Sequence, residues 1–207
     1  SKWLKNKNFE LINHDIIQPI TLEVDKIWHL ACPASPPHYK HDPINTLDVS
    51  FNGSKNMLNL AKKYKSTILI ASSSEIYGDG KDHPQIETYK GCVNTTSSRS
   101  CYVEGKRIAE TLFSDYFRTY DVDIKIARIF NTYGPRMRVN DGRAIPNFIN
   151  QAIRDDDITI YGGNYPFTIN VANNTSGSSR SATVVIEKYN TRVTGVSSQT
   201  LTINQSA

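Results

Sequence analysis

Long apolar runs are missing from this chain. Of its 207 residues, 38% are hydrophobic and 21% are charged, and no apolar stretch reaches membrane length. A helix that crosses a bilayer needs about 20 consecutive apolar residues. The composition is instead typical of a soluble globular protein, so we expect no membrane insertion.

Cysteine is scarce, and histidine is scattered. The three cysteines, Cys32, Cys92 and Cys101, are odd in number and lack Cys-x-x-Cys spacing, and the five histidines form no metal-ligand pattern. A disulfide framework and a zinc site are therefore not indicated, and we expect no metal. The first residues are polar and show no signal-peptide pattern, which favours a reduced, cytoplasmic protein.

A block of basic charge is also absent. The net charge of +4 is spread among interleaved acids and bases. Proteins that follow a nucleic-acid backbone concentrate Lys and Arg in a patch or stripe. We therefore expect no nucleic-acid partner.

Alternating strand and helix patterns are what the chain does contain. Apolar runs of strand length alternate with stretches that repeat apolar residues at helical spacing, which is typical of a doubly wound parallel α/β sheet with helices on both faces. A short strand also precedes this series at residues 9–12. The expected strands are 25–31, 67–71, 122–130 and 158–161, and the expected helices are 46–64, 102–120 and 144–154.

The composition changes near Gly163. From Tyr165 to Ala207, 19 of 43 residues are Ser, Thr or Asn, and alternating strands are expected at 167–171, 182–186 and 200–203. We therefore predict two parts, a partial Rossmann-like domain at 1–164 and a β-rich tail at 165–207. A tail of this length buries little surface alone.

A tyrosine and a lysine lie four residues apart in one expected helix. Tyr102 and Lys106 therefore face the same side, where a fixed ammonium favours the phenolate form of a tyrosine. Ser73, at the end of the strand before the helix, can orient a substrate alcohol against that phenol. The trio predicts proton removal from an alcohol while hydride leaves the same carbon, although Tyr-x-x-x-Lys alone is frequent by chance in helices.

Four ordered blocks make this pattern specific. They are His29 to Pro36, Ser73 to Asp79, Arg99 to Arg107 and Ala127 to Met137. Together they resemble the extended short-chain dehydrogenase/reductase family, most closely its UDP-glucuronate decarboxylase branch.

The resemblance implies a reaction that uses NAD catalytically on a UDP-sugar. Tyr102, with Lys106 and Ser73, would remove the C4 hydroxyl proton to give a 4-keto sugar, which loses carbon dioxide and is reduced to UDP-xylose. Ser74 and Glu75 would serve the decarboxylation stage, with a solvated strand end as the alternative for both.

Related enzymes differ at these positions. Sugar-nucleotide 4,6-dehydratases place an acid where this chain has Ser74, which counts against dehydration. Sugar-nucleotide 4-epimerases share Ser73, Tyr102 and Lys106 but generally lack the Ser-Glu pair, so an NAD-dependent 4-epimerase is the alternative.

Further residues are assigned by the same resemblance. For Arg136, the alternative to a role in ligand binding is an ordinary cation at the surface. The resemblance also implies a homodimer through the helices at 49–64 and 102–120. It places Asp15 near the adenine, Ala31 and Pro33 against the dinucleotide, Lys106 on the nicotinamide ribose, Tyr133 and Pro135 near the nicotinamide, and Asn131 and Arg136 toward the nucleotide sugar.

Two departures from the family pattern stand out. The eleven glycines contain no Gly-x-x-Gly-x-x-Gly cluster, the turn that holds pyrophosphate in dinucleotide folds. We therefore expect a chain that lacks the first βαβ unit and is truncated at both ends, with marginal stability or self-association. The tail resembles part of a bacterial or phage Ig-like repeat, so the rival reading is a non-catalytic fusion whose tail attaches to surfaces.

Overall fold

A computed structural model describes residues 2–80, 82–138, 141–154, 156–161, 180–188 and 197–205. The chain divides into two compact units, Ser1–Thr132 and Tyr133–Ala207, and each is described by itself. None of the helices in the described ranges combines the length and apolarity that a bilayer span requires.

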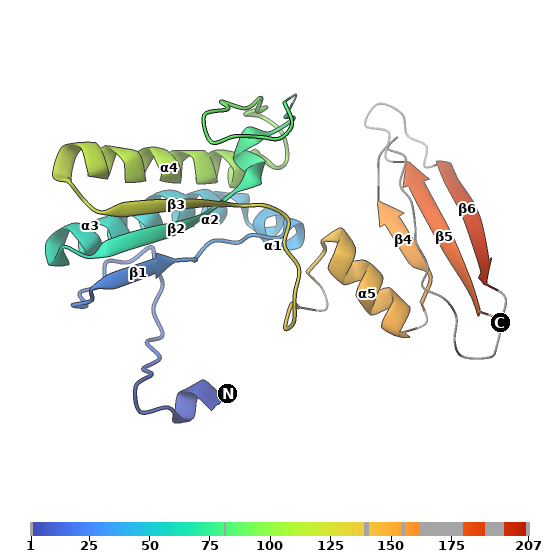
Figure 1. Cartoon of the computed structure of the whole chain (residues 1–207), viewed down its shortest axis with the longest axis horizontal. Coiled ribbons are helices and arrows are strands. Elements are labelled where there is room, and N and C mark those ends of the chain that lie inside the picture. Colours follow the sequence, from blue (N-terminus) through green and yellow to red (C-terminus); the bar gives the residue numbers. More distant parts are fainter. Residues whose placement is uncertain are drawn as a thin grey trace. The chain divides into compact units, whose positions relative to one another are not determined.

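The first unit is built on a three-stranded parallel sheet (Figure 1). Its strands are β1 (Lys26–His29), β2 (Thr67–Ser73) and β3 (Ile124–Ile129), and they lie in the order β1-β2-β3. The register places Trp28 opposite Leu69 and Ser72 opposite Arg128. This confirms the predicted Rossmann-like parallel sheet.

Helical segments connect the strands. Between β1 and β2 the chain forms α1 (Pro36–His41), α2 (Pro43–Asp48), the π-helix η2 (Val49–Gly53) and α3 (Ser54–Tyr64). Between β2 and β3 it forms the 3-10 helix η3 (Ser74–Tyr77) and α4 (Ser100–Tyr120). The helices predicted at 46–64 and 102–120 are thus confirmed.

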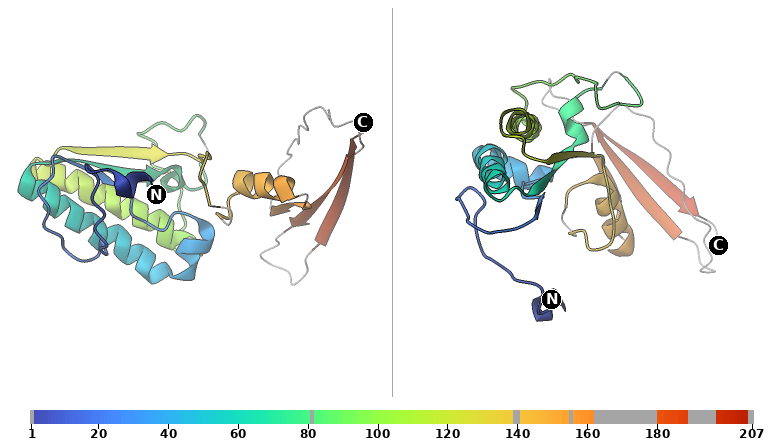
Figure 2. Two further views of the ribbon diagram at one scale, coloured as in Figure 1. Left: turned by 90° about the horizontal axis from the view of Figure 1, so that it is seen from below. Right: turned by 60° about the vertical axis from the view of Figure 1, so that its left-hand side comes forward.

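One face of this sheet packs against α3 and α4 (Figure 2). Ile68 and Ile70 of β2 point to that face and are almost fully buried. On the opposite face Trp28 is 68% exposed and Ile129 is 48% exposed, so within the described part of this unit the helices cover one face, not two. The core cluster consists of Leu58, Ala61, Ile68, Ile70, Ala109, Phe113 and Val122.

The N-terminal segment differs from the sequence prediction. It opens with the 3-10 helix η1 (Lys2–Lys5) and continues without a strand, so the strand predicted at 9–12 is wrong. Leu11 is 69% exposed and Ile12 is 45% exposed. The apolar residues suggested a strand, but a strand also needs a neighbour to accept its backbone hydrogen bonds, and this segment pairs with none of the described strands.

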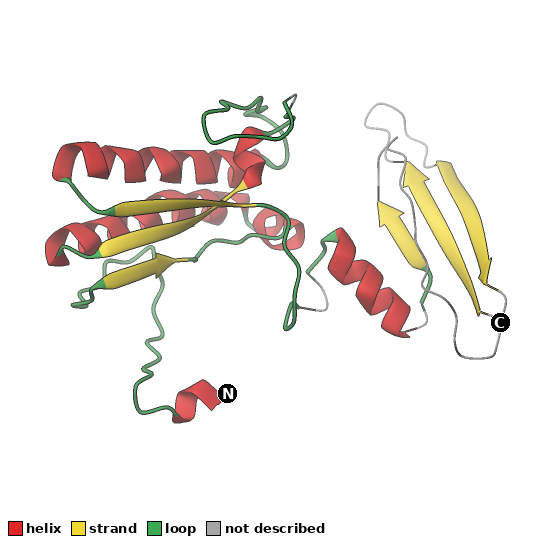
Figure 3. Cartoon of the chain, in the orientation of Figure 1, coloured by secondary structure: helices red, strands yellow, loops and turns green. Residues whose placement is uncertain are grey.

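The second unit contains α5 (Ala144–Arg154) and a separate three-stranded sheet (Figure 3). In that sheet β4 (Ile158–Tyr161) is parallel to β5 (Arg180–Lys188), which is antiparallel to β6 (Ser197–Gln205). The predicted helix 144–154 and strand 158–161 are confirmed, and the strands predicted at 182–186 and 200–203 lie within β5 and β6. The strand predicted at 167–171 and the boundary at residue 164 lie outside the described residues.

Candidate active site

Ser73, Tyr102 and Lys106 come together at the carboxyl end of β2. The Ser73 hydroxyl hydrogen-bonds the Tyr102 phenol, and the Lys106 Nζ donates to the Ala71 carbonyl at 2.8 Å. All three side chains are nearly buried, with exposures of 7%, 7% and 6%. The helical spacing predicted from the sequence therefore brings the phenol, the ammonium and the serine hydroxyl to one strand end.

The ionisation of Tyr102 and Lys106 is dominated by burial. Burial raises the pKa of Tyr102, while its hydrogen bond with Ser73 acts in the opposite direction. Burial lowers the pKa of Lys106, and both the thiol of Cys32 and the carboxylate of Glu110 oppose that shift. The Lys106 Nζ lies 5.9 Å from the Tyr102 ring centroid. The expected lowering of the Tyr102 pKa by Lys106 stays a prediction.

The loop after β1 reaches the same site. Ala31 and Pro33 flank Cys32, whose Sγ lies 3.5 Å from the Ser50 Oγ. Cys32 is close enough to Lys106 to form a hydrogen bond that raises its pKa. Because the carboxyl ends of parallel strands meet at one edge of the sheet, the ends of β1 and β2 form a shared site.

Ser74 and Glu75 lie in the short 3-10 turn that follows Ser73. The Ser73 Oγ accepts a hydrogen bond from the Glu75 backbone N–H at 3.2 Å, which caps this turn. The Glu75 Oε2 lies 2.6 Å from Nη2 of Arg99, and the two side chains are 31% and 50% exposed. Glu75 is thus held beside the trio by a partner that the sequence analysis did not single out.

Tyr39 is another residue that sequence reasoning missed. Its ring stacks on the Tyr102 ring with the centroids 5.0 Å apart. Tyr39 lies in α1, which begins at Pro36 after the loop that contains Cys32. Two prolines at the start of a helix were the available signal, because proline favours the first helical turn, but nothing in the local pattern pointed to Tyr102.

Asp15 lies in a separate turn of the N-terminal segment. Its carboxylate accepts from the Ile17 N–H at 3.1 Å. The side chain of Asn56 in α3 donates to the carbonyls of Ile16 and Ile17 at 3.0 and 2.8 Å, which pins this turn to α3. The predicted adenine contact of Asp15 stays a prediction.

The residues predicted after β3 belong to different units. Asn131 lies at the end of the first unit, whereas Tyr133, Pro135 and Arg136 belong to the second. Tyr133 is 62% exposed, and Arg136 has a left-handed backbone with φ of 74°. Their predicted roles at the nicotinamide and the nucleotide sugar stay predictions.

A partly buried ion pair lies one turn along α4 from Lys106. Glu110 accepts hydrogen bonds from Nε and Nη2 of Arg128 at 3.1 and 2.8 Å and from the hydroxyl of Ser72. Arg128 also donates to the hydroxyl of Tyr77 at 2.9 Å and to the carbonyl of Glu87 at 2.7 Å. These hydrogen bonds, first of all those with Glu110, raise the pKa of Arg128.

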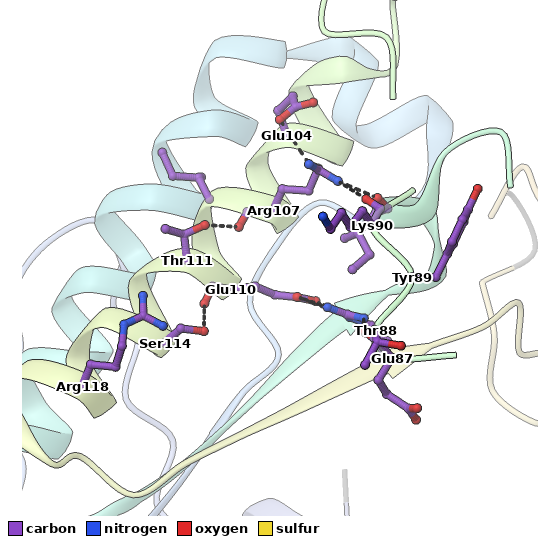
Figure 4. A pocket seen from close by; sticks show the side chains of 13 residues that line it. Glu87, Thr88, Tyr89, Lys90, Glu104, Arg107, Glu110, Thr111, Ser114 and Arg118 are labelled. Atoms are coloured by element: carbon purple, nitrogen blue, oxygen red, sulfur yellow. Dashed lines mark hydrogen bonds and ion pairs between the residues drawn. The ribbon is translucent and has the colours of Figure 1, made fainter. Parts of the chain in front are cut away.

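A cavity of about 790 Å³ opens beside this pair (Figure 4). Glu104, Arg107 and Arg118 line it from α4, and Thr88 and Lys90 line it from the loop before α4. The wall carries acidic and basic side chains together, which gives no preference for one sign of charge. In the described part of the chain, no group of three His, Cys, Asp or Glu side chains is placed to bind a metal.

Residues 4–168 match the family model described as GDP-mannose 4,6 dehydratase. The chain belongs to this family. UDP-glucuronic acid decarboxylase 4 of Arabidopsis thaliana is 57% identical to it over 157 residues, which are 76% of this chain and 35% of that protein. UDP-glucuronic acid decarboxylase 1 of Xenopus tropicalis is 52% identical over 160 residues, which are 77% and 38% of the two chains. The chain thus spans little more than a third of these curated relatives, and the predicted kinship with extended short-chain dehydrogenases/reductases is confirmed.

Solved structures share the fold of this chain. A UDP-glucuronic acid 4-epimerase from Bacillus cereus in complex with NAD matches with a TM-score of 0.62 and 21% identity over 88% of this chain and 54% of that one. A UDP-N-acetylglucosamine 4-epimerase from Methanobrevibacter ruminantium M1 matches with a TM-score of 0.61 and 24% identity over 78% and 47%. At such identities these matches show the fold alone. The likeness of the tail to an Ig-like repeat stays a prediction.

Proposed function

We propose that the protein to which this chain belongs converts UDP-glucuronate to UDP-xylose by NAD-dependent decarboxylation through a 4-keto sugar. The observation that carries the proposal is the meeting of Ser73, Tyr102 and Lys106 at the end of β2. The relatives named UDP-glucuronic acid decarboxylase, at 52% and 57% identity, support the choice of substrate.

The residues at this strand end fit the nicotinamide half of NAD. The ammonium of Lys106 has three N–H donors, of which the Ala71 carbonyl and the Cys32 sulfur accept two, so one donor remains for a ribose hydroxyl. Ala31 and Pro33 would contact the dinucleotide, Tyr133 and Pro135 would flank the nicotinamide, and Asp15 would approach the adenine. When bound, NAD would accept hydride from the sugar and later return it.

Different side chains carry out the two proton transfers of the proposed reaction. Ser73 orients the C4 hydroxyl toward the Tyr102 oxygen, which takes the hydroxyl proton and gives it back when the ketone is reduced. Lys106 favours the phenolate once the site is closed from water. The carboxylate leaves as carbon dioxide, and the electrons of the broken bond form an enolate. Glu75, with Ser74, delivers the proton that converts this enolate to the ketone. Asn131 and Arg136 would hold the nucleotide sugar.

Product analysis tests the proposal. The chain is incubated with NAD and UDP-glucuronate labelled in the carboxylate, and labelled carbon dioxide and UDP-xylose are measured. Tyr102→Phe should lower the rate by about 10²- to 10⁴-fold, the range of general acid-base catalysis. Tyr120→Phe is the matched control, because Tyr120 is 49% exposed at the end of the same helix.

Other products identify the alternatives. Formation of a 4-epimer without carbon dioxide would show that the reaction is epimerisation and not decarboxylation. Calorimetry with NAD alone tests the non-catalytic reading, in which the β-rich tail at 165–207 attaches the protein to a surface. If the chain does not bind NAD, the proposal that this chain is catalytic is wrong.

We also propose a cytoplasmic homodimer formed through residues 49–64 and 102–120. Exposed apolar side chains on these helical segments support it, since Phe51 is 36% exposed and Phe117 is 53% exposed. Sedimentation velocity of the chain and of Phe117→Lys tests the dimer, and a monomer at every concentration would contradict it. We also propose a domain boundary near residue 164.

A further inference from the structure

Three turns of α4 hold the carboxyl end of β2 through polar contacts. Tyr102, Lys106 and Glu110 follow one another at intervals of four residues and therefore face one side of the helix. Their partners are consecutive residues of the strand. Tyr102 meets the hydroxyl of Ser73, Lys106 donates to the carbonyl of Ala71, and Glu110 accepts from the hydroxyl of Ser72.

Arg128 completes this arrangement from the neighbouring strand. In the β2–β3 register it lies opposite Ser72, the residue that also binds Glu110. Its guanidinium bonds both oxygens of Glu110 and continues to Tyr77 in the turn after β2. One ion pair therefore joins α4, β2, β3 and the turn that carries Ser74 and Glu75.

The pair is partly buried at the wall of the cavity, so both charges lose part of their hydration. The side chains of Arg128 and Glu110 are only 23% and 11% exposed. Withdrawing part of two charges from water costs hydration energy, and apolar residues of similar volume often stabilise a fold equally well. The contacts that this pair makes with its neighbours therefore suggest a role beyond stability.

The neighbour that responds is Lys106. Burial lowers its pKa, and the carboxylate of Glu110, one turn further along α4, opposes this shift. The other groups near the ammonium are Cys32 after β1, which also raises its pKa, and His29 of β1, whose own pKa is lowered in part by Lys106. Glu110 is thus the carboxylate that opposes the lowering of the Lys106 pKa.

We propose that Glu110 and Arg128 are positioning residues of the site, which fix α4 on the end of β2 and keep Lys106 charged beside Tyr102. Glu110 supplies the negative charge. Arg128 sets how much of that charge Lys106 experiences, because it shares the same two carboxylate oxygens. The inference rests on the function proposed above, which gives Lys106 its role, but its test requires neither NAD nor a sugar nucleotide.

Competitive acetylation across a range of pH, with mass spectrometry of the peptide that contains Lys106, follows the titration of this lysine in the full chain. In Glu110→Gln, Lys106 should become reactive at lower pH than in the parent chain. In Arg128→Met it should become reactive at higher pH, since Glu110 is no longer shared. Arg128→Lys should lie near the parent.

These directions separate positioning from simple packing. Loosened packing would relieve burial and shift Lys106 to higher pH in both variants, whereas the proposal requires opposite shifts. Asp115→Asn is the matched control, because it removes a carboxylate of the same helix that pairs with Arg118 at the exposed surface, and it should leave the Lys106 titration unchanged.

A Glu110→Gln titration that coincides with the parent, or moves to higher pH, would overturn the proposal. If that variant does not fold, as judged by circular dichroism, Glu110→Asp replaces it. The aspartate withdraws the charge by one methylene and should shift Lys106 in the same direction to a smaller extent. No shift in a folded Glu110→Asp would count equally against the inference. Failure of decarboxylation itself would leave these titrations readable.

Discussion

The ring of Tyr39 lies flat on the ring of Tyr102, with 5.0 Å between centroids and 11° between planes. Tyr39 is only 1% exposed, so it covers one side of the phenol from water. The stacking joins α1, after the first strand, to α4, after the second. The shape of the site therefore depends on a residue that takes no part in proton transfer.

Removing the Tyr39 ring should destabilise the first unit. Tyr39→Ala should lower the free energy of unfolding by about 3–5 kcal/mol, as for other large buried aromatic residues. Tyr39→Phe preserves the stack and should cost about 1 kcal/mol or less. Urea unfolding followed by circular dichroism measures both, and equal losses in the two variants would contradict a role for stacking.

Gly105 should resist replacement by alanine, although it lies inside a helix. A Cβ at this position would lie 2.7 Å from the Oγ and 3.0 Å from the Cβ of Ser50. An alanine in a helix interior normally stabilises by about 1 kcal/mol relative to glycine, but this clash should reverse the sign, at an overpacking cost of about 1–3 kcal/mol.

The double variant Gly105→Ala with Ser50→Ala tests the cause of that loss. Removing the Ser50 hydroxyl takes away the nearest clashing atom, so the double variant should recover part of the stability that Gly105→Ala loses. Ser50→Ala alone is the reference, because it also loses the hydrogen bond to the Thr46 carbonyl. Strictly additive free energies in this cycle would exclude the steric explanation.

Stability should fall in mild acid because of His29. Burial, and secondarily Lys106, lower its pKa from 6.5 to about 4. The unfolded chain therefore binds a proton below pH 6.5 that the folded chain does not, and the free energy of unfolding declines as the pH falls from about 6.5 to about 4. The full loss from this residue is at most about 3 kcal/mol.

The matched pair His29→Gln and His14→Gln isolates this contribution. His14 lies exposed in the N-terminal segment and serves as the matched control for the substitution itself. His29→Gln should flatten the curve between these two pH values, at the cost of stacking on Phe113 and a changed contact with Ser54. An unchanged slope in folded His29→Gln would contradict the assignment.

Association beyond the dimer proposed through residues 49–64 and 102–120 should depend on the sheet face opposite α3 and α4. On this face Trp28 of β1 is 68% exposed and Ile129 of β3 is 48% exposed. Large exposed apolar side chains on one sheet face promote association. Trp28→Lys should reduce the association measured by sedimentation velocity, whereas Ile44→Lys on α2, where Ile44 is 74% exposed, should not. Equal effects of both changes would contradict a role for this face.

The elements around the site were predictable because their signals are local. The apolar run before Ser73 predicts β2, and the helical repeat after Tyr102 predicts α4. The Glu110–Arg128 pair was not predictable, because the position of Arg128 depends on how β3 pairs with β2. The paired residues of these strands, from Ile68↔Ile124 to Ser73↔Ile129, are 56 positions apart in the sequence. The contacts of Tyr39 and Gly105 depend in the same way on how helices pack, which no local pattern records.

The strands of the first unit lie side by side in the order in which the chain is made. Each new strand therefore meets a partner that has already left the ribosome, and no later strand has to insert between two earlier ones. The contacts between α4 and the end of β2 can thus form before β3 is synthesised. The ion pair between Arg128 and Glu110 forms last.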